Sequence, residues 1–140
     1  ATFTYYPNCP GNSTCRPADK VALQSECMPR SRFAGQRLFQ CPVTTVSALM
    51  RKHRLPRVDL LKIDVEGSEL DVLLGIDPAD YPNIHRIVAE VHGSSSEQSA
   101  MCRPTKRVVG LLEKQGYTVH TAPGFPACNT MLFAIRISKI

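Results

Sequence analysis

Acidic side chains and a histidine follow closely on two apolar runs of this 140-residue sequence. Asp64 and Glu66 come directly after the run VDLLKI, and Glu90 and His92 close the run IHRIVAEVH. Such side chains can bind a cationic ligand, hold a metal ion or supply a general base, because neighbouring negative charge and partial burial raise the pKa of a carboxyl group. Glu90 stands inside its apolar run, where an unpaired charge is costly, so it requires a partner or a ligand. These four residues are the first candidates for a functional site.

The elements that must position these residues are two strands and a helix. The near-continuous apolar run at 57–63 is typical of a central parallel strand buried on both faces, and 85–91 predicts a second strand. Between them, Leu70, Leu73 and Leu74 recur at helical spacing. Ligands of an open α/β sheet bind beyond the carboxyl ends of its strands. If the two strands are neighbours, both groups of polar residues therefore face one crevice.

The acids that follow, Glu69 and Asp71, have a simpler explanation. The helix dipole favours carboxylates in the first turn of a helix, so we expect both on its solvent-facing side. Asp64 or Ser68 could cap the same helix. Because Asp64 and Glu66 stand at the strand end rather than on the wet side of the helix, we expect them to have a functional role.

The rest of the chain predicts two regions. Residues 1–43 are rich in Pro, Cys, Asn and Ser, and they read as loops with short edge strands at 2–6 and 37–43. Residues 44–140 predict the order helix, strand, helix, strand, helix, strand, strand, with a first helix that begins behind Thr44 or Thr45. This order is typical of an α/β fold with parallel crossovers and a final antiparallel pair.

Composition excludes several classes of protein. The net charge of +5 is spread along the chain, and its densest basic group, residues 51–57, falls at a predicted helix end, where cations are favoured. Aromatic residues make up 6% of the chain and tryptophan is absent, which argues against a nucleic-acid platform of stacked bases. No run approaches the roughly 20 apolar residues of a membrane helix. We expect a soluble, cytoplasmic protein.

The six cysteines form no CxxC pair and have no histidine at zinc-finger spacing, so a structural zinc site is not expected. Reduced, scattered thiols are the favoured interpretation. If the protein is exported, disulfides are possible among the four cysteines of the first region, Cys9, Cys15, Cys27 and Cys41.

One segment resembles a known family. VDLLKIDVEGSELDVLLGI, residues 58–76, resembles the hallmark segment of the FkbM-type methyltransferases, class I enzymes that transfer a methyl group from S-adenosylmethionine. CPVTTVSALM and RIVAEVHG are similar to the helix and strand that flank this segment in the family, and YYPNCPGNST is similar to an upstream loop of some members. The likeness covers about residues 1–137.

The resemblance implies a Rossmann-like class I methyltransferase sheet of which this chain holds the C-terminal half. Residues 57–63, 85–91, 117–121 and 131–137 correspond to strands 4, 5, 6 and 7, in the spatial order 4-5-7-6. Strands 1–3, with the glycine-rich loop that holds the cofactor's methionine part, would precede residue 1, and Gly11 does not replace that loop. Strand 4 would then expose a hydrophobic edge. We expect the N-terminal half of the domain, or a partner, to cover it.

The resemblance also implies roles for the candidate residues. With S-adenosylmethionine as cofactor and a small-molecule hydroxyl as acceptor, such as that of a polyketide or a sugar, Asp64 is the first candidate for the base and His92 the second. Asp64, Val65 and Glu66 are expected near the cofactor. The expected contacts of the acceptor are Glu90 and residues of the region 1–43, which would cap the acceptor pocket: Tyr5, Tyr6, Asn12, Ser13 and Thr14.

Two alternatives from other classes remain open. The domain could be a non-catalytic remnant of the fold that completes its sheet edge with another chain. Asp64, Glu66, Glu90 and His92 could instead form the metal site of a hydrolase or of a metal-assisted transferase.

Overall fold

The computed structural model describes residues 1–24, 28–92, 102–124 and 129–136. Its strands and helices are β1 (Thr2–Tyr5), α1 (Pro17–Gln24), β2 (Arg37–Gln40), α2 (Val46–His53), β3 (Leu61–Ile63), α3 (Glu69–Leu74), β4 (Arg86–His92), α4 (Cys102–Lys114), β5 (Thr118–Pro123) and β6 (Asn129–Ile135). Short 3-10 turns occupy Pro10–Asn12, Arg30–Phe33 and Tyr81–Asn83. Within these described stretches, every helix is too short or too polar to cross a membrane.

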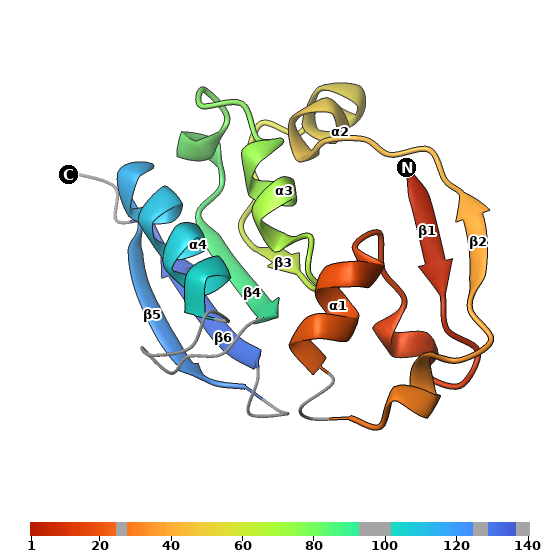
Figure 1. Ribbon diagram of the computed structural model, residues 1–140. Helices are drawn as coiled ribbons and strands as arrows, with labels where there is room; N and C mark the ends of the chain where they lie inside the picture. The colour runs from red at the N-terminus through yellow and green to blue at the C-terminus, as the bar shows by residue number, and fades with distance from the viewer. Residues whose placement is uncertain (25–27, 93–101, 125–128, 137–140) are drawn as a thin grey trace.

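Four strands form the main sheet in the order β3-β4-β6-β5 (Figure 1). β4 runs parallel to β3, with Ala89 opposite Ile63, and antiparallel to β6, with Ala89 opposite Leu132. β5 pairs with the other side of β6, also antiparallel. The predicted α/β sheet, with a parallel crossover and a final antiparallel pair, is confirmed. The parallel neighbours β3 and β4 direct their carboxyl ends toward the same edge of the sheet.

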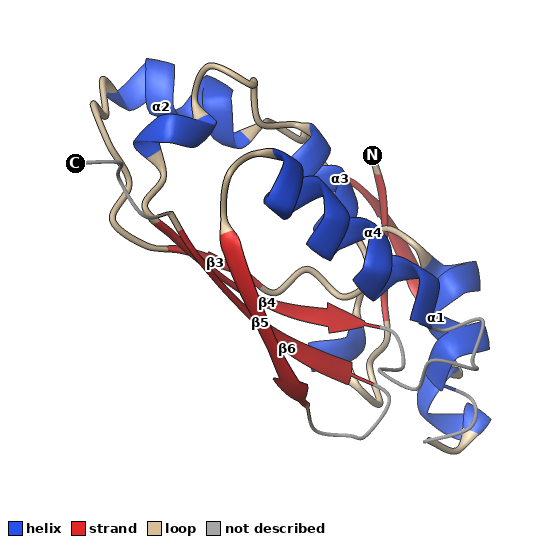
Figure 2. Ribbon diagram, turned by 90° about the vertical axis from the view of Figure 1, so that its left-hand side faces the viewer, coloured by secondary structure: helices blue, strands red, loops and turns tan. Residues whose placement is uncertain are grey.

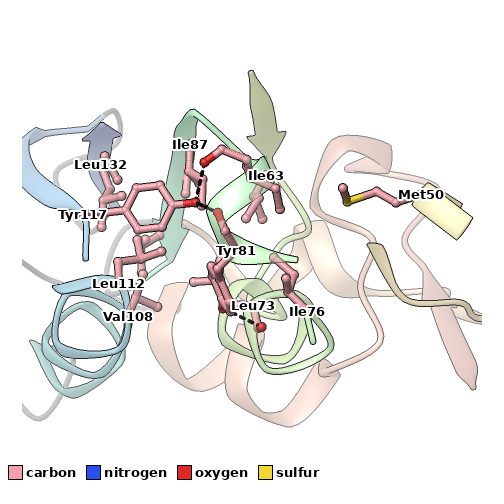
Figure 3. Close-up of a cluster of buried hydrophobic side chains, with 14 residues drawn as sticks. Met50, Ile63, Leu73, Ile76, Tyr81, Ile87, Val108, Leu112, Tyr117 and Leu132 are labelled. Atoms are coloured by element: carbon pink, nitrogen blue, oxygen red, sulfur yellow. Dashed lines mark hydrogen bonds between the residues drawn. The ribbon is translucent and has the colours of Figure 1, made fainter. Parts of the chain in front are cut away.

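Helices α3 and α4 cover one face of this sheet (Figure 2). Their apolar side chains pack on the inward side chains of the central strands, because alternate residues of a strand point to the same face. Buried residues that represent each of these elements are Leu73, Ile87, Val108, Leu112 and Leu132 (Figure 3). This packing fixes the position of α3, and α3 follows directly on the acidic turn after β3.

Two buried tyrosines connect the core to the backbone (Figure 3). The Tyr81 hydroxyl donates to the Leu73 carbonyl at 2.8 Å, and the Tyr117 hydroxyl donates to the Ile84 carbonyl at 2.6 Å. Burial raises the pKa of both phenols to about 12. Both therefore remain neutral hydrogen-bond donors at physiological pH.

The prediction of a central strand at 57–63, buried on both faces, is wrong. β3 is confined to Leu61–Ile63 and lies at the edge of the described sheet, which confirms the exposed edge that the family resemblance implied for this strand. Ile63 is buried, but Leu60 is 55% exposed, since no strand in the described part of the chain pairs with the outer side of β3. On β6, which β4 separates from β3, Phe133 and Ile135 are also exposed. The apolar run thus marks a surface that the described residues leave uncovered.

The first region forms a small structure of its own beside the main sheet. The predicted strands at 2–6 and 37–43 are observed as β1 and β2, which pair antiparallel with Thr2 opposite Gln40. Helix α1 was not expected, because it is short and lies in a stretch rich in proline and cysteine. The described cysteine side chains, Cys9, Cys15 and Cys41, are free thiols, and those of Cys27, Cys102 and Cys128 lie outside the described part.

The predicted cap of α2 is confirmed. Thr45 is the N-cap, and its hydroxyl accepts a hydrogen bond from the Ala48 N–H at 3.1 Å. We expect Thr45→Ala to lower the free energy of unfolding by about 1 kcal/mol, because the Ala48 N–H loses the side-chain hydroxyl that accepts its hydrogen bond. Urea unfolding measures this loss, and Thr45→Ser, which keeps the hydroxyl, serves as the control. Equal stability of Thr45→Ala and the wild type would show that the cap contributes nothing.

Candidate active site

A pocket of about 490 Å³ lies between the first region and the turn that follows β3. It is lined by Phe3, Gly11, Ser13, Cys15, Asp64, Val65, Glu66, Ser68 and Val72. Most of this lining is apolar or small, and its two acids are Asp64 and Glu66. The three residues expected near the cofactor therefore share one pocket with parts of the region expected to cap the acceptor.

Asp64 is the first residue after β3, and its side chain is partly exposed at the pocket. Its Oδ2 lies 3.0 Å from Nζ of Lys62, a solvent-exposed partner on the same strand. An exposed ion pair of this kind is weak and exchanges readily with water. The Asp64 carboxylate is therefore available to a molecule in the pocket.

Glu66 adopts the left-handed backbone conformation, with φ of 52°, and Gly67 follows with φ of 101°. A non-glycine residue in this region costs about 1–3 kcal/mol, so surrounding contacts must hold it there. One such contact is the Thr14 hydroxyl, which donates to the Glu66 carbonyl at 2.7 Å. The DVEG sequence thus encodes a tight turn between β3 and α3, and the glycine supplies the second left-handed position.

Four charged or ionisable side chains meet behind this turn, and we call Lys20, Glu66, Glu69 and His92 the buried ion cluster. Nζ of Lys20 forms an ion pair with Oε2 of Glu66. His92 Nε2 lies 2.9 Å from the same oxygen, and its Nδ1 lies 2.8 Å from Oε1 of Glu69. Lys20, Glu69 and His92 are each at most 3% exposed. Because buried charges are tolerated when they are paired, the cluster links α1, the turn, α3 and β4 in one arrangement.

The expectation that Glu69 lies on the helix surface is wrong. Burial by itself raises the pKa of Glu69, but the hydrogen bonds from His92 and from the Gly67 N–H outweigh it and lower the pKa below the ordinary value of 4.5 for a glutamate. The Gly67 N–H lies 2.8 Å from Oε1. The helical spacing gave a signal for this position, since Glu69 stands one turn before the fully buried Leu73.

The second acid of the helix, Asp71, is on the surface, as expected. Arg16 binds its carboxylate with two nitrogens, at 2.7 and 2.8 Å, and both side chains are nearly half exposed. This pair is a second link between the first region and α3. Its exposure limits its contribution to stability.

The four polar residues at the strand ends divide into two groups. Ligand atoms of Asp64, Glu66 and His92 all lie within 4.8 Å of one another. Glu90 is not in this group, and its Oε1 accepts a hydrogen bond from Asn129 Nδ2 at 2.6 Å. Glu90 thus has the partner that its position within an apolar strand requires.

Among the residues expected to contact the acceptor, Ser13 lines the pocket. Its hydroxyl oxygen accepts the Tyr6 N–H at 3.2 Å. The Tyr6 ring is fully buried against Phe33, with ring centres 5.1 Å apart, and its hydroxyl has no hydrogen-bond partner in the described structure. Tyr6 therefore supports the pocket wall from behind rather than lining it.

The remaining three expected contacts are also outside the lining. Tyr5 packs edge-on against Phe39, with ring centres 6.4 Å apart. The Asn12 side chain lies 3.8 Å from the sulfur of Met28. Thr14 is buried, and its hydroxyl already donates to the Glu66 carbonyl. Four residues of the site, Lys20, Glu69, Phe3 and Cys15, were not among the predicted site residues, and no local pattern distinguishes Lys20 from an ordinary surface lysine.

Comparison with known proteins identifies the family of the chain. Residues 2–119 match the family model of the methyltransferase FkbM domain. The chain is 33% identical over 132 residues to Methyltransferase sdnD from Sordaria araneosa, in an alignment that covers 84% of this chain and 48% of that protein. It is 39% identical over 81 residues to 31-O-demethyl-FK506 methyltransferase FkbM from Streptomyces tacrolimicus, covering 58% of this chain and 28% of that protein.

Methyltransferase 1 from Beauveria bassiana is 32% identical over 123 residues, covering 84% of this chain and 46% of that protein. The chain thus spans about half the length of these first relatives. No solved structure matches it significantly. Because the family model extends over most of its residues, the chain belongs to the FkbM methyltransferase domain family.

Proposed function

We propose that the intact protein transfers a methyl group from S-adenosylmethionine to a hydroxyl group of a small molecule. The observation that carries this proposal is the position of Asp64, an available carboxylate at the end of β3 that lines a pocket in an FkbM-family chain. Ligands of open α/β sheets bind beyond the carboxyl ends of their strands, where this pocket lies.

The sheet supports a Rossmann-like class I methyltransferase fold. The segments assigned to strands 4, 5, 7 and 6 of that fold overlap β3, β4, β6 and β5, which are neighbours in this same order. On this assignment residues 44–140 are the C-terminal half of the domain. Residues 1–43 act as a cap on the acceptor side, since Phe3, Gly11, Ser13 and Cys15 line the pocket opposite the strand end.

The pocket is chemically suited to part of the cofactor. Asp64 and Glu66 supply negative charge beside an apolar wall formed by Val65, a combination that suits a sulfonium cation attached to an apolar group. S-adenosylmethionine, when bound, supplies an electrophilic methyl carbon. In the proposal, Asp64, Val65 and Glu66 contact it, and its remaining contacts come from the part of the intact protein that corresponds to strands 1–3.

The base of the reaction is Asp64. Its exposed carboxylate accepts the proton of the acceptor hydroxyl, and the pocket holds the acceptor oxygen in line for transfer. His92 suits this role less well, because it is buried and each of its ring nitrogens faces a carboxylate oxygen. Ser13 is the expected hydrogen-bond partner for the acceptor, whereas Glu90 is already bonded to Asn129.

Oxygen methylation is supported by one relative, whose name specifies a 31-O-demethyl compound as the molecule it methylates. The test is an assay of the intact protein with S-adenosylmethionine labelled in its methyl group and a panel of hydroxyl-bearing polyketides and sugars. We expect label in an ether product whose mass increases by one methyl group. Label found on nitrogen or carbon, or no transfer to any acceptor above the rate without protein, would contradict the proposal.

A partner-binding role has one observation in its favour, the uncovered outer side of β3. Leu60 is exposed just before β3, and Phe133 and Ile135 are exposed on β6, two strands away, so the described residues leave apolar surface of the sheet without a cover. We infer that strands 1–3 of the intact protein supply it, since the chain spans about half of its relatives. Hydrogen exchange of the intact protein is expected to protect the amides of β3 that point away from β4, and rapid exchange of these amides would favour a separate partner.

A metal-dependent reaction is the second candidate, because donor atoms of Asp64, Glu66 and His92 lie close together. However, the Lys20 ammonium already contacts Glu66 Oε2 and supplies a positive charge that balances this carboxylate. We therefore expect methyl transfer to be unchanged in excess EDTA. A loss of activity on chelation that added Mg²⁺ or Mn²⁺ restores would favour the metal site.

A further inference from the structure

We infer that Lys20 is a positioning residue that holds the DVEG turn, residues 64–67, in its active conformation. The inference rests on the proposed function, because it concerns the same carboxylate, Asp64. Lys20 lies on α1 in the first region, whereas Asp64 follows β3. The two are connected through Glu66, which stands two residues after Asp64 and forms an ion pair with Lys20.

The turn has a conformational reason to need such a contact. Glu66 is held in the left-handed region, where a side-chain-bearing residue is strained. Its carbonyl is fixed by Thr14 and its carboxylate by Lys20, so both contacts come from a stretch of the first region just before and within α1. Without the Lys20 contact, Glu66 can relax toward an ordinary backbone conformation, and Asp64 moves with it.

Burial distinguishes the ion pair of Lys20 from the other ion pair that this stretch makes with the turn and α3. Its side chain is 1% exposed, whereas Arg16, which binds Asp71 a turn away, is 44% exposed. Removal of one partner from a buried ion pair leaves the other charge uncompensated, but an exposed pair is worth little. Lys20 and Arg16 therefore form a matched test of the inference.

The contact also defines what Glu66 does in the pocket. Glu66 lines the pocket, but its Oε2 is shared between Lys20 and His92. This engagement leaves Asp64 as the carboxylate that can accept a proton from the acceptor. Lys20 thus acts through Glu66 and does not touch the reacting atoms.

The test measures kcat and KM of the intact protein with S-adenosylmethionine and the best acceptor of the panel. A misplacement of about 1 Å lowers the rate by up to about 100-fold, so we expect Lys20→Met to lower kcat by about 10- to 100-fold. KM for S-adenosylmethionine should stay within about threefold, because the remaining cofactor contacts persist. Lys20→Arg, which keeps the charge, should recover most of kcat, and Arg16→Met should stay within about twofold of the wild type.

The double variant Lys20→Met/Glu66→Gln is the control for a loss of stability, because it removes both charges of the pair together. We expect it to unfold at a higher urea concentration than Lys20→Met and to have the kcat of Glu66→Gln alone. A kcat of Lys20→Met within twofold of the wild type would overturn the inference. So would a double-mutant cycle in which the effects of Lys20→Met and Glu66→Gln on the free energy of unfolding are strictly additive. If the wild type transfers no methyl group, the proposed function fails, and the unfolding cycle still measures whether Lys20 and Glu66 are coupled.

Discussion

Replacement of Asp64 by asparagine is expected to lower kcat for methyl transfer by about 10²–10⁴-fold, the range that general acid–base catalysis contributes. Asparagine keeps the size of the side chain but cannot accept the hydroxyl proton. Asp64 lines the pocket, and Lys62, its exposed partner, does not withdraw it from a bound acceptor. The effect should appear in kcat, because the cofactor keeps its other contacts.

Steady-state kinetics of the intact protein with the acceptor from the panel measures this loss. Asp59→Asn is the matched control, since Asp59 is an exposed, ion-paired acid just before the same strand and lies outside the pocket lining. It should keep wild-type kcat. If Asp64→Asn retains more than a tenth of kcat while Asp59→Asn is normal, Asp64 is not the base, and His92 becomes the candidate.

The convergence of Asp64, Glu66 and His92 could be predicted from the sequence, because it depends on one rule of α/β sheets. Two apolar runs joined by a helix form parallel neighbours, so the residues after them meet at one edge. The rule uses only the order of elements. It could not place Glu90, because the identity of its partner depends on β6, which is about 40 residues further along the chain.

The errors on α3 have a different cause. The three leucines of the helix predict an apolar stripe, but Leu74 is 61% exposed while Leu73 is fully buried. The buried side of the helix is therefore rotated toward Glu69, which lies one turn before Leu73. A short helix has too few residues for its apolar spacing to fix this rotation, and the contact with His92 decides it.

The burial of Lys20 could not be predicted, because it depends on a contact that the local sequence does not encode. A lysine in a short helix is ordinarily solvated, and its burial here requires Glu66, 46 residues later in the chain. The edge position of β3 followed from the family resemblance and not from the apolar run itself. The apolar run around β3 indicates that this strand is buried in the intact protein. It does not indicate which part of the protein buries the strand.

Replacement of Glu69 by glutamine is expected to lower the free energy of unfolding by about 1.5–3 kcal/mol at neutral pH, the range for a hydrogen bond to a charged group. Glutamine can still accept the Gly67 N–H, but it loses the charge that faces His92. The His92 ring then remains buried with one carboxylate partner, Glu66. Urea unfolding of the wild type and the variant at pH 7 measures the difference.

The difference in the free energy of unfolding between the wild type and Glu69→Gln must depend on pH. The lowered pKa of Glu69 determines whether this difference grows or shrinks as the pH falls. Since the pKa of Glu69 in the folded protein lies below the ordinary glutamate value of 4.5, the unfolded chain takes up the proton first as the pH falls. The contribution of Glu69 is therefore complete well above pH 4.5 and is lost as the pH falls through the folded pKa. The stability gap between the wild type and Glu69→Gln should narrow over this range, whereas Glu113→Gln, a change at an exposed glutamate on α4, should show no comparable gap. A gap that stays constant from pH 7 down to pH 3 would mean that the Glu69 charge does not stabilise the fold, and that its burial beside His92 depends on packing.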